Sequence, residues 1–224
     1  MSVSRIGSLA AAVVLAVFLI TLSKGISLAD GKGTFASKGC GGCHQTEGPA
    51  TEKTFEDKLK QKGVELWYAG SKFKKAWLVE WLEKPVIIRL MAYNSVSEKN
   101  TIQHPALSKA EAQEVGDYLM TLTAKEVVPG SVEEKGGAKA KNLFIKQYGC
   151  IACHILPVKA GGKKQGGVTG PDLSEADKRL NGAWVYAYLK DIKLFKPVRR
   201  MPNFAGIIPD EEMKALAGFV TGPR

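Results

Sequence analysis

The chain has 224 residues, of which 45% are hydrophobic, so it is long enough for about two domains that each bury a modest core. Lysine and arginine number 32 against 22 aspartate and glutamate, and a basic surface of this kind favours an acidic protein partner or an anionic membrane. No extended stretch of basic and aromatic residues typical of a nucleic-acid binding site appears, so nucleic acid is the weaker prediction.

The segment 1–29 has the pattern of an export signal. Arg5 supplies a positive start, positions 6–22 are largely apolar, and Ser27-Leu28-Ala29 before Asp30 has the small-x-small form of a signal peptidase site. The apolar run is also just long enough to span a bilayer, so the segment can instead remain as an N-terminal membrane anchor. We favour the anchor. Both alternatives put the rest of the chain on the periplasmic side of the membrane, with Arg5 on the inner side.

A five-residue motif occurs twice. Cys40-Gly41-Gly42-Cys43-His44 recurs in the second half of the chain as Cys150-Ile151-Ala152-Cys153-His154, and the two copies use all four cysteines. Two thiols one helical turn apart, followed by a histidine, are typical of a covalently attached c-type haem. Neither the compact spacing of a zinc site nor the βαβ context of a redox dithiol is visible. We therefore predict two haem c groups, attached through Cys40, Cys43, Cys150 and Cys153, with His44 and His154 as iron ligands.

The residues around the first motif predict short helices and loops. A short helix anchored by Phe35 is expected over 32–38, followed by a polar loop over 45–71. Apolar residues over 76–82 recur at spacings of three and four, which predicts an amphipathic helix that ends before Pro85. Ser108 followed by Glu111 is a capping-box sequence and predicts a helix that runs to about Leu122.

The second half repeats this order. The segment 124–141 is charged, contains glycine and lacks an apolar period, so we predict a linker there. A glycine- and lysine-rich loop follows the second motif at 161–167, and a helix is expected over 183–189. Pro209 and the three acidic residues after it predict the start of a last helix, which runs to Phe219.

The two halves keep a common register. Arg89 and Met91 correspond to Arg199 and Met201 at the same offset in residue number that separates the two motifs. Between these points the offset is slightly smaller, as shown by the pairs Gly63 with Gly170, Leu66 with Leu173 and Trp77 with Trp184. The offset thus becomes smaller after the motifs and returns to its first value at the two methionines. This return predicts that Met91 and Met201 have the same role.

With these motifs and methionines, the segment 30–224 resembles two tandem class I cytochrome c domains. The resemblance implies an all-α fold in which each domain wraps a few helices around its haem. Domain 1 would span 30–123 and domain 2 would span 142–224, joined by the linker at 124–141 and preceded by a hydrophobic helix within 1–29.

The resemblance also implies a methionine as the second iron ligand, commonly followed by proline. Met201-Pro202 fits this pattern, whereas Met91 is followed by Ala92. We expect Met201 and Met91 to bind the two irons. His104, the only histidine outside the motifs, is the alternative ligand for the first iron.

Further roles are implied by the same resemblance. The carbonyl of Pro171 is expected to accept a hydrogen bond from the imidazole of the second motif, with Val64 or Pro49 in that role in the first half. Arg89 and Arg199 are candidates to pair with haem propionates, and the alternative is that both are ordinary surface charges.

The function implied is electron transfer rather than enzymatic catalysis. The settings considered are a membrane-tethered subunit or partner of a quinol-oxidising cytochrome bc-type complex, a cbb3-type terminal oxidase, and a soluble shuttle similar to cytochrome c4. Redox proteins with acidic docking faces would be the partners. The rival class is a dihaem enzyme, either a peroxidase or a thiosulfate dehydrogenase. A peroxidase needs an open iron position, and two methionine ligands argue against one.

Overall fold

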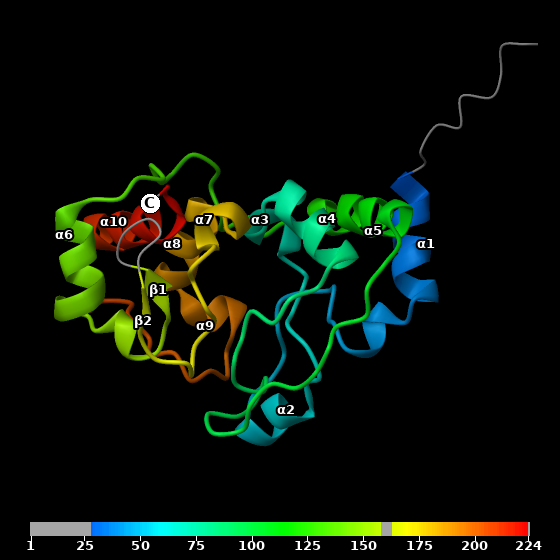
Figure 1. Ribbon diagram of the computed structural model, residues 1–224, viewed down its shortest axis with the longest axis horizontal. Helices are drawn as coiled ribbons and strands as arrows, with labels where there is room; N and C mark the ends of the chain where they lie inside the picture. The colour runs from blue at the N-terminus through cyan, green and yellow to red at the C-terminus, as the bar shows by residue number, and fades with distance from the viewer. Residues whose placement is uncertain (1–27, 158–162, 224) are drawn as a thin grey trace, which may run out of the picture.

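A computed structural model describes residues 28–157 and 163–223. These residues form mainly helices, arranged as two halves that lie side by side (Figure 1). The predicted export signal or anchor at 6–22 lies outside the described residues. Among the helices that the structure describes, none is long and apolar enough to cross a membrane.

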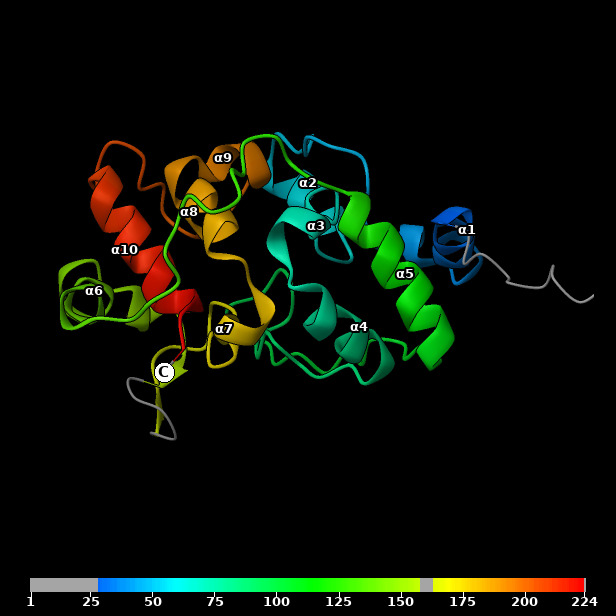
Figure 2. The ribbon, with the colours of Figure 1, turned by 90° about the horizontal axis from the view of Figure 1, so that it is seen from above.

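The first half of the chain is a series of short helices joined by loops. These elements are α1 (Leu28–Ser37), the 3-10 turn η1 (Cys40–Gly42), α2 (Phe55–Lys60), α3 (Ala69–Lys72), α4 (Lys75–Glu83) and α5 (Lys109–Thr121). Helix α5 packs against α1 and also contacts α3 and α4 (Figure 2). The first and last helices of this half therefore lie against each other, with the first motif directly after α1.

The second half repeats this arrangement and adds a small hairpin. Its elements are α6 (Ala138–Asn142), the π-helical turn η2 (Leu143–Gln147), the 3-10 turn η3 (Cys150–Ala152), β1 (Leu156–Pro157), β2 (Lys164–Gln165), α7 (Ala176–Arg179), α8 (Gly182–Lys190), α9 (Ile192–Phe195) and α10 (Asp210–Thr221). Helix α10 contacts α6, α7 and α8. Strands β1 and β2 pair antiparallel and are too short to give an alternating pattern in the sequence.

The predicted helix boundaries are confirmed where local sequence signals set them. The hydroxyl of Ser108 accepts a hydrogen bond from the backbone N–H of Glu111, and the carboxylate of Glu111 accepts one from the N–H of Ser108. Helix α4 ends at Glu83, before Pro85, and α10 begins directly after Pro209.

Two predicted irregular segments contain helices. The polar loop at 45–71 includes α2, which is capped by reciprocal hydrogen bonds between Thr54 and Asp57. Phe55 and Leu59 of α2 are 47% and 51% exposed, so this helix has no buried stripe for a periodicity search to find. The predicted linker at 124–141 likewise includes the start of a helix, because α6 begins at Ala138 and packs on α10.

Aromatic rings from both halves form the centre of the hydrophobic core. Trp67 of the first half stacks on Phe195 of the second with ring centroids 5.8 Å apart, and Tyr68 stacks on Trp184 at 5.7 Å. Tyr68 and Phe195 are completely buried. The halves are therefore joined by core packing as well as by the linker.

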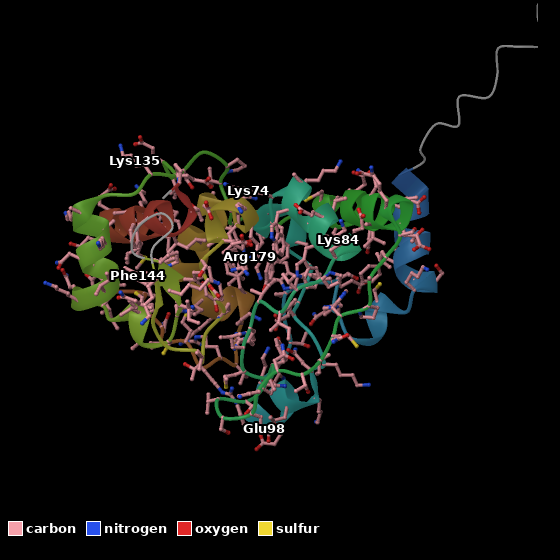
Figure 3. All side chains as sticks on the ribbon, viewed as in Figure 1. Lys74, Lys84, Glu98, Lys135, Phe144 and Arg179 are labelled. Atoms are coloured by element: carbon pink, nitrogen blue, oxygen red, sulfur yellow. The ribbon has the colours of Figure 1, made fainter. Side chains whose placement is uncertain are left out.

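Equivalent backbone segments of the two halves meet around Phe73 and Leu180, which form an antiparallel bridge. The N–H of Lys74 donates to the carbonyl of Arg179 at 3.0 Å, and the N–H of Asn181 donates to the carbonyl of Lys72 at 2.9 Å. Figure 3 shows Lys74 and Arg179 at this junction. In the repeat, Lys72 corresponds to Arg179 and Lys74 corresponds to Asn181, so each half contributes the same donor and the same acceptor. The junction is therefore close to two-fold symmetric.

Candidate metal centres

Each motif forms a tight turn that begins at a glycine. Gly39 and Gly149 have φ angles of 68° and 60°, a left-handed conformation that costs glycine little. The turn that follows brings the N–H of His44 to 3.0 Å from the carbonyl of Cys40, and that of His154 to 3.1 Å from that of Cys150. The motif cysteines and histidine thus lie on one compact turn in each half.

The four motif thiols are free and differ in exposure. Cys43 and Cys153 are exposed, while Cys40 and Cys150 are half-buried. Burial raises the pKa of Cys150 to about 11, so its thiol is neutral at pH 7. Each turn therefore presents one thiol to solvent and one toward the protein.

Both motif imidazoles are oriented by a backbone carbonyl. Nδ1 of His44 lies 2.8 Å from the carbonyl oxygen of Val64, and Nδ1 of His154 lies 2.9 Å from that of Pro171. A carbonyl oxygen only accepts, so each Nδ1 carries the hydrogen and each Nε2 keeps a lone pair for a metal. Burial lowers the pKa of His154, which also favours the neutral, ligating form. Pro49, the alternative to Val64, instead accepts from the side chain of Gln45.

A glycine lies directly against each of these imidazoles. A Cβ atom at Gly63 would stand 2.8 Å from Cε1 of His44, and one at Gly170 would stand 2.6 Å from Cε1 and Nδ1 of His154. Real Cβ atoms essentially never approach other atoms so closely. In the sequence these glycines stand out only as corresponding positions of the two halves, and this correspondence is the signal that they have a common role.

The segments that carry the acceptor carbonyls are hydrogen-bonded to the residues after each motif. The N–H of Leu66 donates to the carbonyl of Gln45 at 2.7 Å, and that of Leu173 donates to the carbonyl of Ile155 at 2.9 Å. These bonds hold each glycine and carbonyl at a fixed position relative to the imidazole.

The predicted methionine ligands differ in their surroundings. Met201 is half-buried and packs against the hydrophobic core. Met91 lies in a loop, where it forms an isolated bridge with Lys99, and it is not among the residues that pack on the described core. The ring of His104 lies 6.0 Å from that of His44 and 4.7 Å from that of Trp81, measured between centroids.

The two candidate propionate-binding arginines contact backbone carbonyls. Nη1 of Arg89 donates to the carbonyl of Thr169, in the other half of the chain, at 3.2 Å. Nη1 of Arg199 donates to the carbonyl of Pro197 at 2.9 Å, while its Nε is buried without a hydrogen-bond partner among the described residues. Arg89 therefore bridges the halves, and Arg199 retains an unused donor.

Other buried donors along the junction of the halves also have no hydrogen-bond partner within residues 28–157 and 163–223. They are the indole nitrogens of Trp67 and Trp184, the hydroxyl of Tyr68 and Nε of Arg179. No pattern in the sequence marks these groups as a set. Buried donors are usually paired, so they can receive an acidic group such as a haem propionate. Together with the oriented imidazoles and the free thiols, they fit covalently bound haem.

Two further observations bear on alternative sites. No group of three or more histidine, cysteine and acidic side chains gathers in the described part of the chain as a metal-binding cluster. A cavity of about 670 Å³ lies between the linker and the start of α8, with Ser71, Lys125 and Asn181 in its lining, and it includes no motif residue.

Comparison with protein families gives a match in the second half of the chain. Residues 137–220 match the model described as Cytochrome C oxidase, cbb3-type, subunit III. Searches of curated proteins and of solved structures found no match. The matched segment contains the second motif, Pro171 and Met201, and its helix-rich fold is consistent with a cytochrome c domain. The match supports a c-type cytochrome, the class defined by covalently bound haem c and associated with electron transfer.

Proposed function

We propose that the chain is a dihaem c-type cytochrome that transfers electrons between redox partners outside the cytoplasm and does not itself catalyse a reaction. One observation carries the proposal. The family match covers the second half, and the first half has the same oriented imidazole, with Nδ1 of His44 on Val64 and Gly63 against the ring. The same local geometry at both motifs supports one haem in each half.

The proposed ligands follow from this geometry. Cys40 and Cys43 attach the first haem, and Cys150 and Cys153 attach the second. His44 and His154 bind the irons through Nε2, because their Nδ1 atoms are engaged by carbonyls. Met201 is the second ligand of the second iron, and the first iron takes either Met91 or His104. When bound, haem supplies the ferric/ferrous couple.

Residues of the chain would fill the coordination positions that haem leaves free on both irons. With two residues of the chain bound to each iron, no position would be left for a substrate, and the aromatic rings of the core would exclude water. Such sites exchange electrons without a change of ligands. A dihaem peroxidase or thiosulfate dehydrogenase, the rival proposal, would need an exchangeable position on one iron.

Carbon monoxide separates these two proposals, because it binds ferrous haem only at an open or weakly held position. We expect the spectrum of the reduced protein to be unchanged by carbon monoxide at neutral pH. A stoichiometric carbon monoxide complex, together with turnover of peroxide or thiosulfate, would instead support the enzyme.

The proposed setting is a respiratory membrane complex. The protein would be either a tethered subunit or partner of a cytochrome bc-type complex or the cytochrome subunit of a cbb3-type terminal oxidase. The description of the matched family favours the oxidase. Affinity purification from native membranes distinguishes them, because the co-purifying subunits belong to one complex or the other.

The proposed tether can be tested directly. Mass spectrometry of the protein isolated from membranes is expected to find the N-terminal segment retained. A mature protein that starts at Asp30 and appears in the soluble periplasmic fraction would contradict the anchor and leave the dihaem proposal intact.

A further inference from the structure

His104 and Met91 are the two candidates that would bind the first iron together with His44, and the structure separates them. Resting on the proposed function, we propose that His104, and not Met91, is this ligand. The first haem would then be held by two histidines and the second by His154 and Met201. The two sites of one chain would differ in iron ligation although their motifs are the same.

The separation of the two imidazoles matches a shared metal. The ring centroids of His44 and His104 are 6.0 Å apart. Two imidazoles on opposite sides of one metal ion, each bonded at about 2 Å, have ring centres roughly 6 Å apart once the ring radius is added. The 43° angle between the ring planes is compatible with this geometry, because each ring can rotate about its metal bond.

The hydrogen bonds of His104 match those of the motif histidines. Its Nδ1 lies 2.9 Å from the carbonyl oxygen of Pro105 and must carry the hydrogen, as in His44. In the part of the chain that the structure describes, neither Nε2 has a hydrogen-bond partner. Both rings therefore keep the same nitrogen free for a metal, which is the arrangement that ligating histidines usually show.

Helix α4 fixes the position of His104. The indole ring of Trp81 lies 4.7 Å from the imidazole between centroids, and its Nε1 is bonded to the carbonyl of Val86 at 2.9 Å. A short way after His104, the N–H of the buried Leu107 donates to the carbonyl of Leu82 at 2.9 Å. The imidazole is therefore positioned by packed groups on a rigid element.

The location of His104 in its half also corresponds to that of Met201. Each residue precedes a proline in the segment that leads to the last helix of its half. Met201 lies shortly before the N-cap Pro209, and His104 lies shortly before the N-cap Ser108. Met91 is much farther from Ser108 along the chain. The common register of the halves therefore ends after Met91. In the first half it is His104, and not Met91, that lies just before the last helix, as Met201 does in the second half.

Met91 is committed to a different local structure. It pairs with Lys99 in an isolated bridge, and the adjacent Ala92 donates its N–H to the carbonyl of Glu98 at 2.9 Å. The residues between Met91 and His104 thus fold back on themselves as a loop. This loop accounts for the longer distance from Met91 to helix α5.

The proposed ligation gives the electron a direction. A histidine–methionine pair raises the reduction potential of haem relative to two histidines. The first haem would therefore have the lower potential and receive the electron, and the second would hold it and pass it on. The donor would dock on the first half and the acceptor on the second.

Two matched variants test the ligand assignment, namely Met91→Leu and His104→Ala. The near-infrared charge-transfer band of methionine-bound ferric haem should have the intensity of one site per two haems in the unmodified protein. We expect Met91→Leu to leave this band unchanged and Met201→Leu to abolish it. His104→Ala should leave the band intact, convert one haem to high spin, and recover low spin when imidazole is added.

If Met91→Leu removes half of the band and His104→Ala leaves both haems low-spin, Met91 is the ligand and the proposal is overturned. A haem count on every variant separates this result from failure of the proposed function, which would give fewer than two haems per chain even in the unmodified protein. A redox titration provides a further readout, because His104→Met should raise the lower of the two potentials toward the higher.

Discussion

Single glycines set how closely the backbone approaches the imidazole of each motif. At Gly63 and Gly170 there is no room for a Cβ atom, because it would overlap the ring that the neighbouring carbonyl orients. The acceptor carbonyl belongs to the residue directly after the glycine, so a displaced glycine moves the hydrogen bond as well. Ring orientation and ligand basicity are thus controlled together.

Substitution of Gly63 tests this control. Gly63→Ala should displace His44, destabilise the first half by about 1 to 3 kcal/mol and convert part of one haem to high spin. Gly42→Ala is the matched control, since a Cβ there meets no atom within 4 Å and Ala152 occupies the equivalent position of the second motif. Electron paramagnetic resonance and denaturant unfolding measure both effects. Equal behaviour of the two variants would contradict the proposed contact.

At the scale of elements, α5 begins where its capping residues require. The reciprocal bonds of Ser108 and Glu111 satisfy two backbone donors at the helix start, and α5 contributes the buried face that packs on α1. This start also fixes the end of the segment that carries His104. The cap therefore stabilises both the helix and the approach of the chain to the first site.

Removal of this cap should have a moderate cost. We expect Ser108→Ala to lower the free energy of unfolding by about 1 kcal/mol, because a backbone donor at the helix start loses its partner. The control is Ser97→Ala at an exposed position in the preceding loop, expected to change stability by less than about 0.5 kcal/mol. Chemical denaturation of both variants gives the comparison. A loss in Ser108→Ala no larger than in the control would show that the cap contributes nothing.

Elements were predictable from the sequence where the signal was local. Capping residues and prolines set the boundaries of α4, α5 and α10, and both appear directly in the sequence. Helix α2 was missed because Phe55 and Leu59 face solvent. The sequence named His104 only as the alternative ligand of the first iron. Its position 6.0 Å from the ring of His44 depends on the loop after Met91, whose fold no local signal sets.

At the scale of the whole molecule, a buried acidic group ties the halves together. Glu65 follows the acceptor residue Val64, is 1% exposed, and pairs with Lys58 at 2.8 Å and with Lys196 of the second half. Burial raises the pKa of Glu65, but the two lysines outweigh this effect and hold its pKa at about 2. Such tertiary pairing could not be predicted from the register of the repeats alone.

The lowered pKa of Glu65 makes the stability of the folded protein depend on pH. In the unfolded chain this carboxyl has a pKa near 4.5, so its contribution is fully present above that pH and is lost as the pH falls toward 2. The difference corresponds to about 3 kcal/mol. Glu65→Gln should therefore destabilise the protein by roughly this amount at pH 7 and flatten the stability curve between pH 4.5 and 2, as measured by denaturant unfolding across pH.

An exposed carboxylate provides the control for this prediction. Glu98 lies in the loop near α2 and makes no ion pair among the described residues (Figure 3). Glu98→Gln should leave both stability and its pH dependence unchanged. An identical pH profile for the unmodified protein and Glu65→Gln would contradict the role given to the buried pair.

If both halves carry haem, as we propose, the number of haem groups per chain must be two. The pyridine haemochrome assay on the purified protein, together with its intact mass, should give two covalently bound haem c groups per chain. Replacement of Cys40 and Cys43 by serine should reduce the count to one. A count of one in the unmodified protein would show that only one half carries haem and would overturn the proposed function.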